Sequence, residues 1–584
     1  MYEVRLIRGK ERRTLSARPG QNLFRLFQEN GVSVWAPCGG RGVCGKCKVR
    51  LDPAPDPGQS RGFLSRRELD EGVRLCCKTA VWQNMTAEIC EGEAHVEVET
   101  EAGIGRLSPS VRAERRHFSP PSLEDQTDFA DRSGFEKISP RALNALAEAM
   151  RGKTEAAMAV FRDGTVFAPA DGGLYGMALD IGTTTLAAYL FDLESGRRLG
   201  VRSAVNPQRV FGQDVISRMD HARTPQGLKE LSACIRQGVN RLIEGFREDF
   251  GIPEVAHLTV TGNTTMLHLL AAVRPDTMAQ SPFIPVFTRT LEAEGGQWGL
   301  NAGYVTLLPS LSAYVGADVL GGACASEVDR KKDLTLYLDV GTNGEMLLGR
   351  SGQFLGCATA AGPAFEGANI SCGMPAMEGA VTAFRAEGGE LCAEVLGGGE
   401  PKGLCGSGLL DAVAVLLELG VIDPSGAFAE EEDLPDPLRS RFTSAVLPDG
   451  RQVTGFRLCG EVVLLQTDIR ELQLAKAAVA AGIYTLLKEL DARPEEIGEV
   501  LIAGGFGNYL DPASAAAVGM IPPNLRDRVR GVGNASGAAA CLALCDRAFL
   551  TRVEDFKKQV KNVELSGSAL FNEFYMNCLL FEGE

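Results

Sequence analysis

The chain has 584 residues, of which 45% are hydrophobic and 23% are charged, and its formal net charge is -15. This composition is that of an ordinary globular protein, and the length predicts roughly three or four domains because one core rarely serves more than about 200 residues. The negative charge argues against nucleic-acid binding, which depends on Lys and Arg neutralising phosphates. No run has the ~20 apolar residues of a membrane span, and the charged N-terminal stretch lacks the pattern of a signal peptide. We therefore expect a cytoplasmic protein.

The first 92 residues predict a small β-grasp domain. Residues 2–9 and 12–20 have the pattern of a strand pair, and residues 22–31 that of a short amphipathic helix that Gly31 ends. The loop that follows, APCGGRGVCGKCKVR, is rich in glycine. Glycines permit tight turns in which backbone N–H groups converge on sulfur atoms and stabilise their negative charge. This loop predicts an iron–sulfur cluster.

The cluster ligands in the loop are Cys38, Cys44 and Cys47, in the spacing C-x5-C-x2-C. A structural zinc site is the alternative, but it usually takes two C-x2-C pairs and the second pair is missing. The domain resembles plant-type 2Fe–2S ferredoxins, with one extra residue in the first gap. In those proteins the fourth ligand follows Arg-Leu-Ala, so the resemblance places Cys77 of VRLCCKTA in that position and leaves Cys76 as the alternative.

The next two segments predict a linker and a small middle domain. Residues 93–121 lose the apolar pattern and collect charges, Ser and Pro, which predicts a linker. Residues 122–173 predict a small α/β middle domain, with Ser139 capping a helix and two strands joined at an Asp-Gly turn. Nothing in them suggests chemistry, so the expected role is support or dimer contact.

From residue 174 to residue 584 the pattern predicts a large two-lobed domain. Residues 177–196 and 336–353 echo each other, because each has an apolar strand ending in Asp, then a Gly-Thr turn, then a second apolar strand. Asp180 and Asp339 are too far apart for a solenoid repeat, so the echo favours two duplicated lobes.

Both hairpins suit phosphate binding. Backbone N–H groups and hydroxyls at a Gly-Thr turn can hold phosphate oxygens, and the Asp before the turn can hold Mg²⁺ directly or through water. One such turn is common, whereas two that face each other across a cleft are a strong signal for ATP. The candidate ligands are Asp180, Gly182, Thr183 and Thr184 in the first hairpin, and Asp339, Gly341, Thr342 and Asn343 in the second.

These hairpins resemble the phosphate loops of the acetate kinase, sugar kinase, heat-shock ATPase and actin superfamily. In EVLIAGGFGNYL the resemblance implies an adenosine loop, where Gly504, Gly505 and Gly507 let the backbone approach the nucleotide. Residues 260–268, VTGNTTMLH, look like the equivalent turn of the first lobe or are a plain strand–helix connection. The chain has no P-loop motif, and GVGNASGA at 531–538 indicates a helix entry beside the nucleotide.

Two further segments carry polar residues in otherwise packed patterns. Asp214, in NPQRVFGQDVISRM, and Glu345 are the two candidates for positioning the attacking water, and local hydrogen bonding is the alternative role of each. Residues 467–483 have an amphipathic helical pattern, which predicts that Gln473 and Lys476 face solvent.

The whole arrangement, including the segments DIRELQLAKAA and GANISCGMPA, resembles one family: the reductive activators of corrinoid-dependent enzymes. The resemblance implies a cytoplasmic, homodimeric, ATP-hydrolysing iron–sulfur reductase that binds neither nucleic acid nor membrane. An electron from a low-potential donor would enter the 2Fe–2S cluster and pass to the cob(II)alamin of a corrinoid protein, regenerating cob(I)alamin. The client, from a methyltransferase or an acetyl-CoA synthesis system, is not readable from the sequence, nor is the donor.

Two alternatives from other classes remain open. The first is an ATP-dependent electron donor to a radical dehydratase or reductase, but such activators hold a 4Fe–4S cluster between two ATPase subunits. The second is a redox-sensing, actin-like scaffold or binding module, which would bind a partner without net electron transfer.

Overall fold

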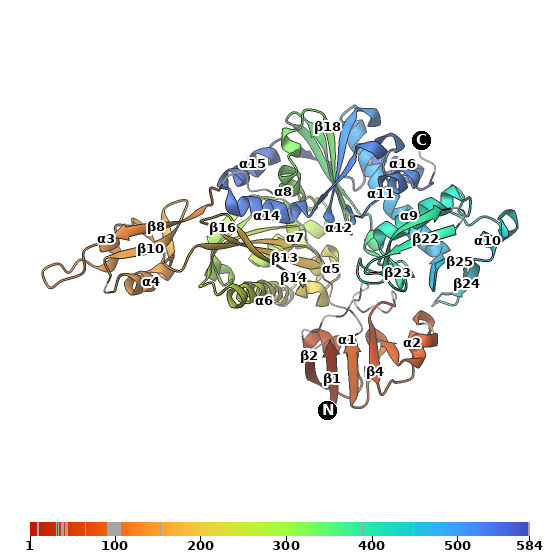
Figure 1. Cartoon of the computed structure of the whole chain (residues 1–584), viewed down its shortest axis with the longest axis horizontal. Helices are drawn as coiled ribbons and strands as arrows, with labels where there is room; N and C mark the ends of the chain where they lie inside the picture. Colours follow the sequence, from red (N-terminus) through yellow and green to blue (C-terminus); the bar gives the residue numbers. More distant parts are fainter. Residues whose placement is uncertain are drawn as a thin grey trace.

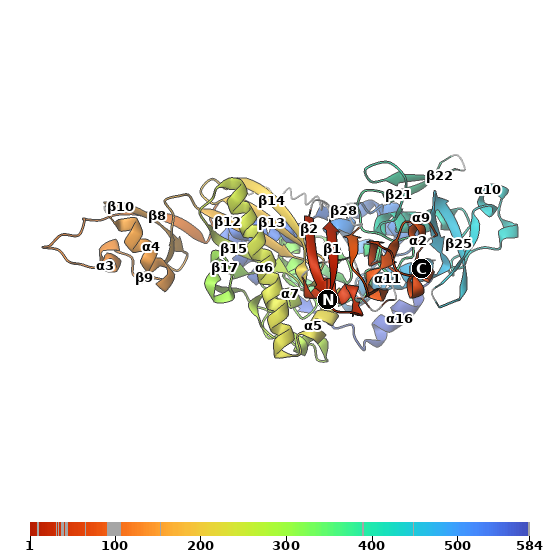
Figure 2. The ribbon, with the colours of Figure 1, turned by 90° about the horizontal axis from the view of Figure 1, so that it is seen from below.

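The computed structural model describes residues 1–581 apart from 9–10, 31, 33, 35, 37–39, 41, 43–44, 65, 90–106, 152, 388–389, 448 and 508. Figure 1 shows a two-lobed body, a small domain that projects from one end of it, and the N-terminal domain lying beneath the junction of the lobes. Seen from below in Figure 2, the N-terminal domain lies between the long helix of the first lobe and the outer strands of the second.

The N-terminal domain is built on a sheet with strand order β2-β1-β7-β4-β5, in which only β1 and β7 run parallel. Its strands are β1 (Tyr2–Arg8), β2 (Glu11–Ala17), β4 (Lys48–Asp52), β5 (Val73–Leu75) and β7 (Met85–Ile89). The helix α1 (Leu23–Glu29), capped by Asn22, buries its Leu and Phe side chains in the core. The predicted strand pair and helix are confirmed, with the helix ending at Glu29. A ribbon of β3 (Gln21–Asn22) and β6 (Ala80–Val81) joins the start of α1 to the segment that follows η2 (Cys76–Lys78).

The projecting domain has a sheet with strand order β8-β10-β11-β9. Its elements are β8 (Val111–His117), α3 (Phe129–Ser133), β9 (Lys137–Ile138), α4 (Pro140–Met150), β10 (Glu155–Phe161) and β11 (Thr165–Pro169). The side chain of Ser139 caps α4, as predicted. The strand β8 lies inside the segment 93–121 that the sequence predicts as a linker. Its strongly charged sequence hides the strand, because only its first residue, Val111, is buried.

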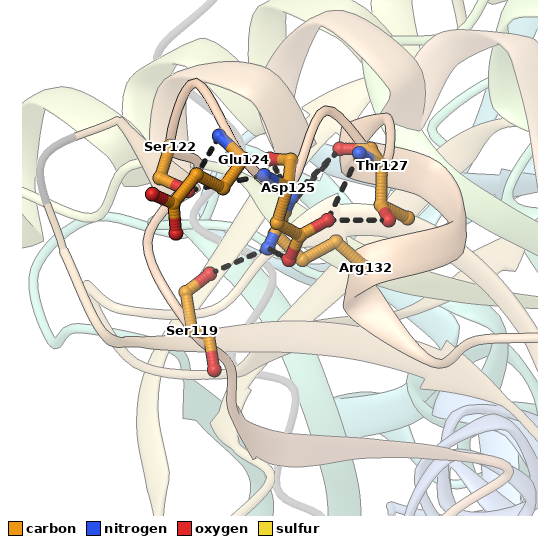
Figure 3. A network of polar contacts seen from close by, with 6 residues as sticks. All are labelled: Ser119, Ser122, Glu124, Asp125, Thr127 and Arg132. Atoms are coloured by element: carbon orange, nitrogen blue, oxygen red, sulfur yellow. Dashed lines mark hydrogen bonds and ion pairs between the residues drawn. The ribbon is translucent and has the colours of Figure 1, made fainter.

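One arginine gives the loop before α3 a defined path (Figure 3). The guanidinium of Arg132 donates to the carbonyl oxygens of Ser119 (3.0 Å), Asp125 (2.9 Å) and Thr127 (3.0 Å), and to the Asp125 carboxylate (2.8 Å). The bonds from Arg132 and from the Thr127 hydroxyl hold the pKa of Asp125 well below its ordinary value. A polar, Pro-containing loop is thus fixed by hydrogen bonds in place of apolar burial.

The first lobe contains a sheet with strand order β14-β13-β12-β15-β17-β16. The strands are β12 (Tyr175–Ile181), β13 (Thr185–Asp192), β14 (Arg198–Val205), β15 (Val255–Gly262), β16 (Leu291–Glu294) and β17 (Ala302–Leu307). The helices are α5 (Val215–His221), α6 (Pro225–Phe250), α7 (Thr264–Ala271) and α8 (Ala317–Ala325). Both β12 and β15 are buried nearly throughout, as expected for central strands covered on both faces.

The second lobe repeats this plan in the strand order β28-β27-β18-β19-β20-β29. The strands are β18 (Leu334–Val340), β19 (Gly344–Arg350), β20 (Gln353–Thr359), β27 (Ile497–Ala503), β28 (Val529–Gly533) and β29 (Val560–Asn562). The helices are α9 (Gly406–Glu418), α10 (Asp436–Arg439), α11 (Gln466–Glu489), α12 (Gly504–Gly507), α13 (Pro512–Ala517), α14 (Ala535–Cys545), α15 (Arg547–Lys557) and α16 (Ala569–Asn577). Two small sheets extend it, formed by β21 (Ala380–Glu387), β22 (Glu390–Val395) and β23 (Gly403–Leu404), and by β24 (Phe442–Val446), β25 (Gln452–Cys459) and β26 (Val462–Leu465).

The lobes share two helices. The helices α8 and α14 pack against each other, and α14 also packs on β12 and β15 of the first lobe. Close packing is possible because both helices are made of small residues: a Cβ added to Gly321 would lie 2.9 Å from the Ala539 side chain. The predicted two-lobed, actin-like architecture is confirmed, with each Asp-Gly-Thr hairpin at the end of its lobe's central strand.

The prediction for the polar residues of α11 is wrong. Gln473 and Lys476 are buried, because the C-terminal segment packs over them. Gln473 donates to Leu579 O (2.8 Å), and Lys476 donates to Leu580 O and lies over the Phe581 ring. Within the described ranges, no helix joins the length to the hydrophobicity needed for crossing a membrane.

Candidate functional site

The first hairpin turns tightly between β12 and β13. Gly182 N–H donates to Thr185 O (2.9 Å), and a Cβ on Gly182 would lie 2.9 Å from the same oxygen, so this turn requires glycine. Asn263 caps α7 and donates from its side chain to Thr183 Oγ1 (3.2 Å). The turn at 260–268 is therefore a strand–helix connection that also contacts the first hairpin.

A buried arginine supports this hairpin from behind. Arg218 is fully buried and donates to Thr183 O (2.6 Å) and Gly212 O (2.8 Å). Asn206 adds bonds to the carbonyl oxygens of Gly182 (2.8 Å) and Thr184 (2.8 Å). Burial lowers the pKa of Arg218 to about 9, which still leaves it cationic at neutral pH. The hairpin backbone is thus fixed before any ligand binds.

The second hairpin is held by carboxylates. Gly341 N–H donates to Asn343 O (2.9 Å), closing the turn between β18 and β19. The Thr342 hydroxyl donates to Glu366 Oε1 (2.7 Å), and the Asn343 amide donates to Glu345 Oε1 (3.2 Å). The second turn is one residue shorter than the first, because Val340 pairs with Gly344 whereas Ile181 pairs with Leu186, and its surroundings also differ.

The structure places each of the two predicted aspartates against the start of a helix. Ser536, in the first turn of α14, donates to Asp180 Oδ1 (2.9 Å). A Cβ on Gly504 would lie 3.1 Å from Asp339 Oδ1, and Gly504 has a φ of 85°. The start of α12 therefore lies against Asp339, and the segment around Asn534 forms the predicted helix entry.

The electrostatics link the carboxylates across the lobes. Burial raises the pKa of Asp180 to about 6, against the hydrogen bonds from Ser536 and Asn534. Burial and then the charge of Asp180 raise the pKa of Asp339 to about 6. Asp318, in the first turn of α8, has its pKa raised to about 8 by burial and by Asp339. The pKa of Glu345 is also well above its ordinary value, through burial, Asp318 and Asp339.

These carboxylates do not form a preformed metal cage. Among the residues that the structure describes, no three or more His, Cys, Asp or Glu side chains lie close enough to hold one metal ion. Mg²⁺ is usually bound by one or two carboxylates together with waters and substrate phosphates. The donor set therefore fits a cation that arrives with a nucleotide.

The remaining predicted residues have distinct places. The Asp214 side chain caps α5 by accepting from Ser217 N (2.8 Å), which is a local structural role, whereas Glu345 faces the other carboxylates. Gly505 has open space around it, and a Cβ on Gly507 would lie 2.8 Å from Ile502 O. Sequence reasoning missed Asp318 and Arg218. A lone carboxylate at the start of the apolar helix α8 was the available signal for Asp318.

Among the described cysteines of the cluster site, one pair of sulfurs lies in contact. Cys47 Sγ lies 3.1 Å from Cys77 Sγ. Hydrogen bonds from the thiols of Cys76 and Cys77 lower the pKa of Cys47 strongly, which favours the thiolate that a metal centre needs. Cys76 is fully buried and Cys77 is half-buried, while Cys38 and Cys44 lie outside the described residues. The donor set fits an iron–sulfur cluster.

The residue next to Cys47 ties this domain to the second lobe. Lys46 Nζ donates to the carbonyl oxygens of Ile370 (2.9 Å), Ser371 (3.1 Å) and Gly373 (2.8 Å). Ser371 is in turn bonded through its N–H and hydroxyl to the Asp468 carboxylate at the start of α11. On the other side, the Gln28 side chain of α1 donates to Val210 O of the first lobe. The N-terminal domain thus contacts both lobes.

Three family models match the chain in sequence order. A 2Fe–2S iron–sulfur cluster binding domain matches residues 7–81, the RACo middle region matches residues 175–331, and the C-terminal ASKHA domain of RACo matches residues 333–584. The first and third matches agree with the predicted cluster and the predicted ATP site.

Whole-chain relatives agree with these models. The corrinoid activation enzyme RamQ of Eubacterium limosum is 32% identical over 428 residues, 70% of each chain. A Co(II) methylated amine-specific corrinoid protein reductase of Methanosarcina barkeri is 26% identical over 439 residues, 69% of this chain and 76% of the relative. A solved structure, described as a reductive activator for corrinoid, iron–sulfur protein, has a TM-score of 0.71 at 28% identity, covering 99% of this chain and 98% of that one. The chain belongs to the family of corrinoid activation enzymes, as its motifs predicted.

Proposed function

We propose that this protein is an ATP-dependent reductive activator of a corrinoid protein. One electron leaves the reduced 2Fe–2S cluster and reduces the client's cob(II)alamin to cob(I)alamin, so the cluster is oxidised by one electron and no bond to the chain forms. The observation that carries the proposal is the Lys46 contact. It joins the cluster loop directly to the ATPase lobe, so that nucleotide state and electron transfer can be coupled within one chain.

The cluster ligands are Cys38, Cys44, Cys47 and Cys77. Both thiols are bonded to Cys47, and we prefer Cys77 to Cys76 because Cys77 is half-buried at a surface groove, whereas Cys76 is fully buried in the core. The cluster, when bound, supplies a one-electron carrier of low potential. The chain contributes the cysteine thiolates, an apolar core on which the cysteines pack, and Lys46, which bonds the cluster loop to the second lobe.

The nucleotide lies between the two hairpins. The two turns hold phosphate, with Gly182, Thr183 and Thr184 from the first lobe and Gly341, Thr342 and Asn343 from the second. The N–H groups of Gly182 and Gly341 close the turns, so the phosphate meets the other N–H groups and the hydroxyls. Asp180 and Asp339 hold Mg²⁺ through water or directly. Gly504, Gly505 and Gly507 border the adenosine. Glu345 orients the attacking water, and burial raises the pKa of Glu345, which makes its carboxylate a stronger base.

ATP is needed because the electron must move uphill. Plant-type clusters lie near about -400 mV, and each 100 mV of unfavourable potential difference for one electron costs about 2.3 kcal/mol. Nucleotide binding and hydrolysis can supply this only if the protein binds the two states of the client with different affinity.

The test uses full-length protein with its cluster, a chemical reductant and purified candidate corrinoid proteins. The absorbance change from cob(II) to cob(I) is followed with Mg²⁺·ATP, with a non-hydrolysable analogue, and without nucleotide. Reduction that requires hydrolysable ATP supports the proposal. No ATP dependence with any client would contradict it and favour the scaffold function, whereas a 4Fe–4S spectrum would favour the dehydratase-type electron donor.

The assembly and its place in the cell complete the proposal. The protein acts as a cytoplasmic homodimer that takes electrons from a low-potential donor. Exposed leucines on the projecting domain, Leu123 (93% exposed) and Leu143 (47%), support a dimer contact there. Sedimentation of wild type and of a variant with both leucines changed to Ser tests the dimer.

A further inference from the structure

A polar groove opens at the one half-buried cysteine of the described cluster residues. It has a volume of about 1000 Å³. The described residues that line it all belong to the N-terminal domain: Arg18, Pro19, Gly20, Gln21, Asn22, Phe24, Arg25, Gln28, Glu29, Gly40 and Cys77. The Asn22 side chain donates to Cys77 O (2.8 Å), so the floor of the groove is bonded directly to a proposed cluster ligand.

The groove belongs to a domain whose charge is opposite to that of the rest of the chain. Residues 1–90 hold 16 Lys and Arg against 9 Asp and Glu, a net charge of +7, whereas the remaining residues carry -22. Several basic side chains of this domain are already paired, including Lys48 with Glu68 and Arg50 with Glu88. The domain therefore has basic charge beyond what its own carboxylates neutralise.

Arg18 and Arg25 carry part of that unpaired charge. Both side chains are exposed at the groove, and within the described part of the chain neither makes a side-chain hydrogen bond or an ion pair. Among the described residues of the lining, Glu29 is the one carboxylate, and it accepts a hydrogen bond from Gln21 (2.7 Å). The groove therefore presents two free guanidinium groups to solvent.

An exposed tryptophan stands at the rim. Trp82 is 65% exposed, although large apolar side chains are normally covered. It lies against Gly20, where an added Cβ would come within 2.8 Å of the indole ring. Trp and Arg are the residue types most enriched in the energetic centres of protein–protein interfaces. We define the Arg18–Trp82 surface as Arg18, Gly20, Arg25, Trp82 and the exposed edge of Cys77.

The opposite side of the cluster loop faces the second lobe. There Lys46 is bonded to three carbonyl oxygens of the second lobe. On the groove side, Gln28 donates to Val210 O of the first lobe. Of the described cysteines near the cluster, Cys47 and Cys76 are fully buried. Because electron transfer slows steeply with distance, a partner must approach where a ligand reaches the surface, and Cys77 is such a point.

We propose that the Arg18–Trp82 surface is the docking site of an acidic electron-transfer protein, the donor that reduces the cluster. The inference rests on the proposed function and deepens it by naming the partner's chemistry. In the step, the donor's reduced centre loses one electron and the oxidised cluster gains it, with no proton or bond transferred. Complementary charge speeds the encounter and orients the partner.

The lining favours a protein over a small redox carrier. Pockets for small organic cofactors are mostly apolar and bury most of the ligand. In this groove the apolar contributions come from Pro19 and the buried Phe24, and the other side chains are polar, charged or absent. A protein surface that bears carboxylates matches two arginines beside a tryptophan.

The experiment measures cluster reduction in full-length protein by stopped-flow absorbance. The donor is a reduced acidic bacterial ferredoxin, and photoreduced deazariboflavin is the small, uncharged reductant for comparison. Two double variants have the same charge change: Arg18→Glu with Arg25→Glu at the surface, and Arg61→Glu with Arg66→Glu at exposed positions elsewhere in the domain. Trp82→Ala is a third variant.

We expect the Arg18/Arg25 variant to lose about 10-fold or more in the second-order rate with ferredoxin at low salt, and the Arg61/Arg66 variant to stay within about twofold. High salt should slow the wild type and remove the difference. Trp82→Ala should slow reduction at every salt concentration. With deazariboflavin all variants should match the wild type. Titration calorimetry with oxidised ferredoxin should show the same order in affinity.

Other results overturn the inference. Equal losses in both double variants would mean that only net charge matters, and no loss would place the donor elsewhere. If the Arg18/Arg25 variant takes electrons normally from ferredoxin but reduces the corrinoid slowly, the surface binds the client. Failure of wild type to show ATP-dependent corrinoid reduction with deazariboflavin would instead remove the proposed function and leave the docking result standing.

Discussion

The two lobes share a five-stranded order, β14-β13-β12-β15-β17 and β20-β19-β18-β27-β28, and each has an Asp-x-Gly-Thr hairpin, but they stabilise the hairpins in opposite ways. In the first lobe the buried cation Arg218 and the amide of Asn206 bond to the carbonyl oxygens of the turn. In the second lobe the side chains of Thr342 and Asn343 are bonded to Glu366 and Glu345. The first hairpin is held by side chains that donate hydrogen bonds to it, whereas the second hairpin donates hydrogen bonds to carboxylates.

This difference suits the two hairpins to different parts of the bound nucleotide. A hairpin whose backbone oxygens already accept hydrogen bonds presents few bare acceptors to a ligand, which suits phosphate. A hairpin among carboxylates with raised pKa values suits a cation and a proton. Duplication supplied the scaffold, and the neighbouring side chains distinguish the two copies.

The largest expected effect tests whether both copies are needed. Asp180→Ala and Asp339→Ala should each lower the rate of ATP-driven corrinoid reduction by at least about 100-fold, because each removes a charge aimed at the bound cation. The cluster absorbance should be unchanged in both. Asp527→Ala, at a side chain that is 87% exposed, is the control. If one of the two variants kept wild-type ATP-dependent turnover, only one lobe would hold the cation.

The second prediction concerns the buried cation of the first lobe. Arg218→Met should weaken nucleotide binding about 10-fold and lower the unfolding free energy, since each carbonyl left without a donor costs about 1–3 kcal/mol. Isothermal titration with ATP and urea unfolding measure the two effects, and Arg218→Lys should recover part of both. Arg236→Met, which removes one bond to Leu270 O in the same lobe, should change stability alone. Equal ATP affinity in both Met variants would contradict the support role.

The third prediction compares how firmly each lobe holds the N-terminal domain. Lys46→Met removes three hydrogen bonds to the second lobe and Gln28→Ala removes one to the first, so the first variant should free the domain more. Small-angle scattering should show a larger radius of gyration for Lys46→Met, with corrinoid reduction slowed about 3- to 10-fold. Lys48→Met, which breaks a bond to Glu68 inside the domain, is the control. A compact Lys46→Met protein would show that other contacts hold the domain.

The smallest effect concerns the buried cation of the second lobe. Burial lowers the pKa of Lys476 to about 8, below its ordinary 10.5. The unfolded chain therefore keeps this proton up to about pH 10.5, whereas the folded chain loses it near pH 8. At neutral pH the buried charge of Lys476 lowers the free energy of unfolding. This free energy should increase as the pH rises from about 8 to 10.5, because the folded chain has then lost the proton and the unfolded chain has not.

Thermal unfolding of the wild type and of Lys476→Met, at intervals over that pH range, isolates this group. The melting temperature of the wild type should rise by about 2–4 °C relative to the variant. Arg218 should show no such change below pH 8, because its pKa stays near 9. Parallel curves for wild type and Lys476→Met would show that Lys476 is charged in both states.

The fold and the paired hairpins could be predicted from the sequence, because both depend on patterns of neighbouring residues. An apolar strand that ends in Asp before a Gly-Thr turn needs no knowledge of distant residues, and Asp180 and Asp339 do lie on the central strands of their sheets. The family prediction succeeded for the same reason, since the cysteine loop and the hairpins are contiguous motifs.

What could not be predicted depends on contacts between distant segments. Lys476 matched the solvent face of an amphipathic helix, but a segment 104 residues later covers it. Nothing in the sequence around Arg218 distinguishes it from the other arginines. Its role depends on the bond to Thr183 O, 35 residues away. Asp318 joins the carboxylates only because α8 packs between the lobes. The identity of the fourth sulfur, Cys76 or Cys77, depends on burial that spacing does not encode.

Three hydrogen bonds of Lys46 go to main-chain oxygens, and this has an evolutionary consequence. Bonds to carbonyl groups do not depend on the side chains of residues 370–373. Substitutions in this segment can therefore leave the three bonds from Lys46 intact. Such a connector is modular. A ferredoxin domain from another family member should function when transplanted onto this ATPase, provided that it keeps a lysine immediately before the third loop cysteine.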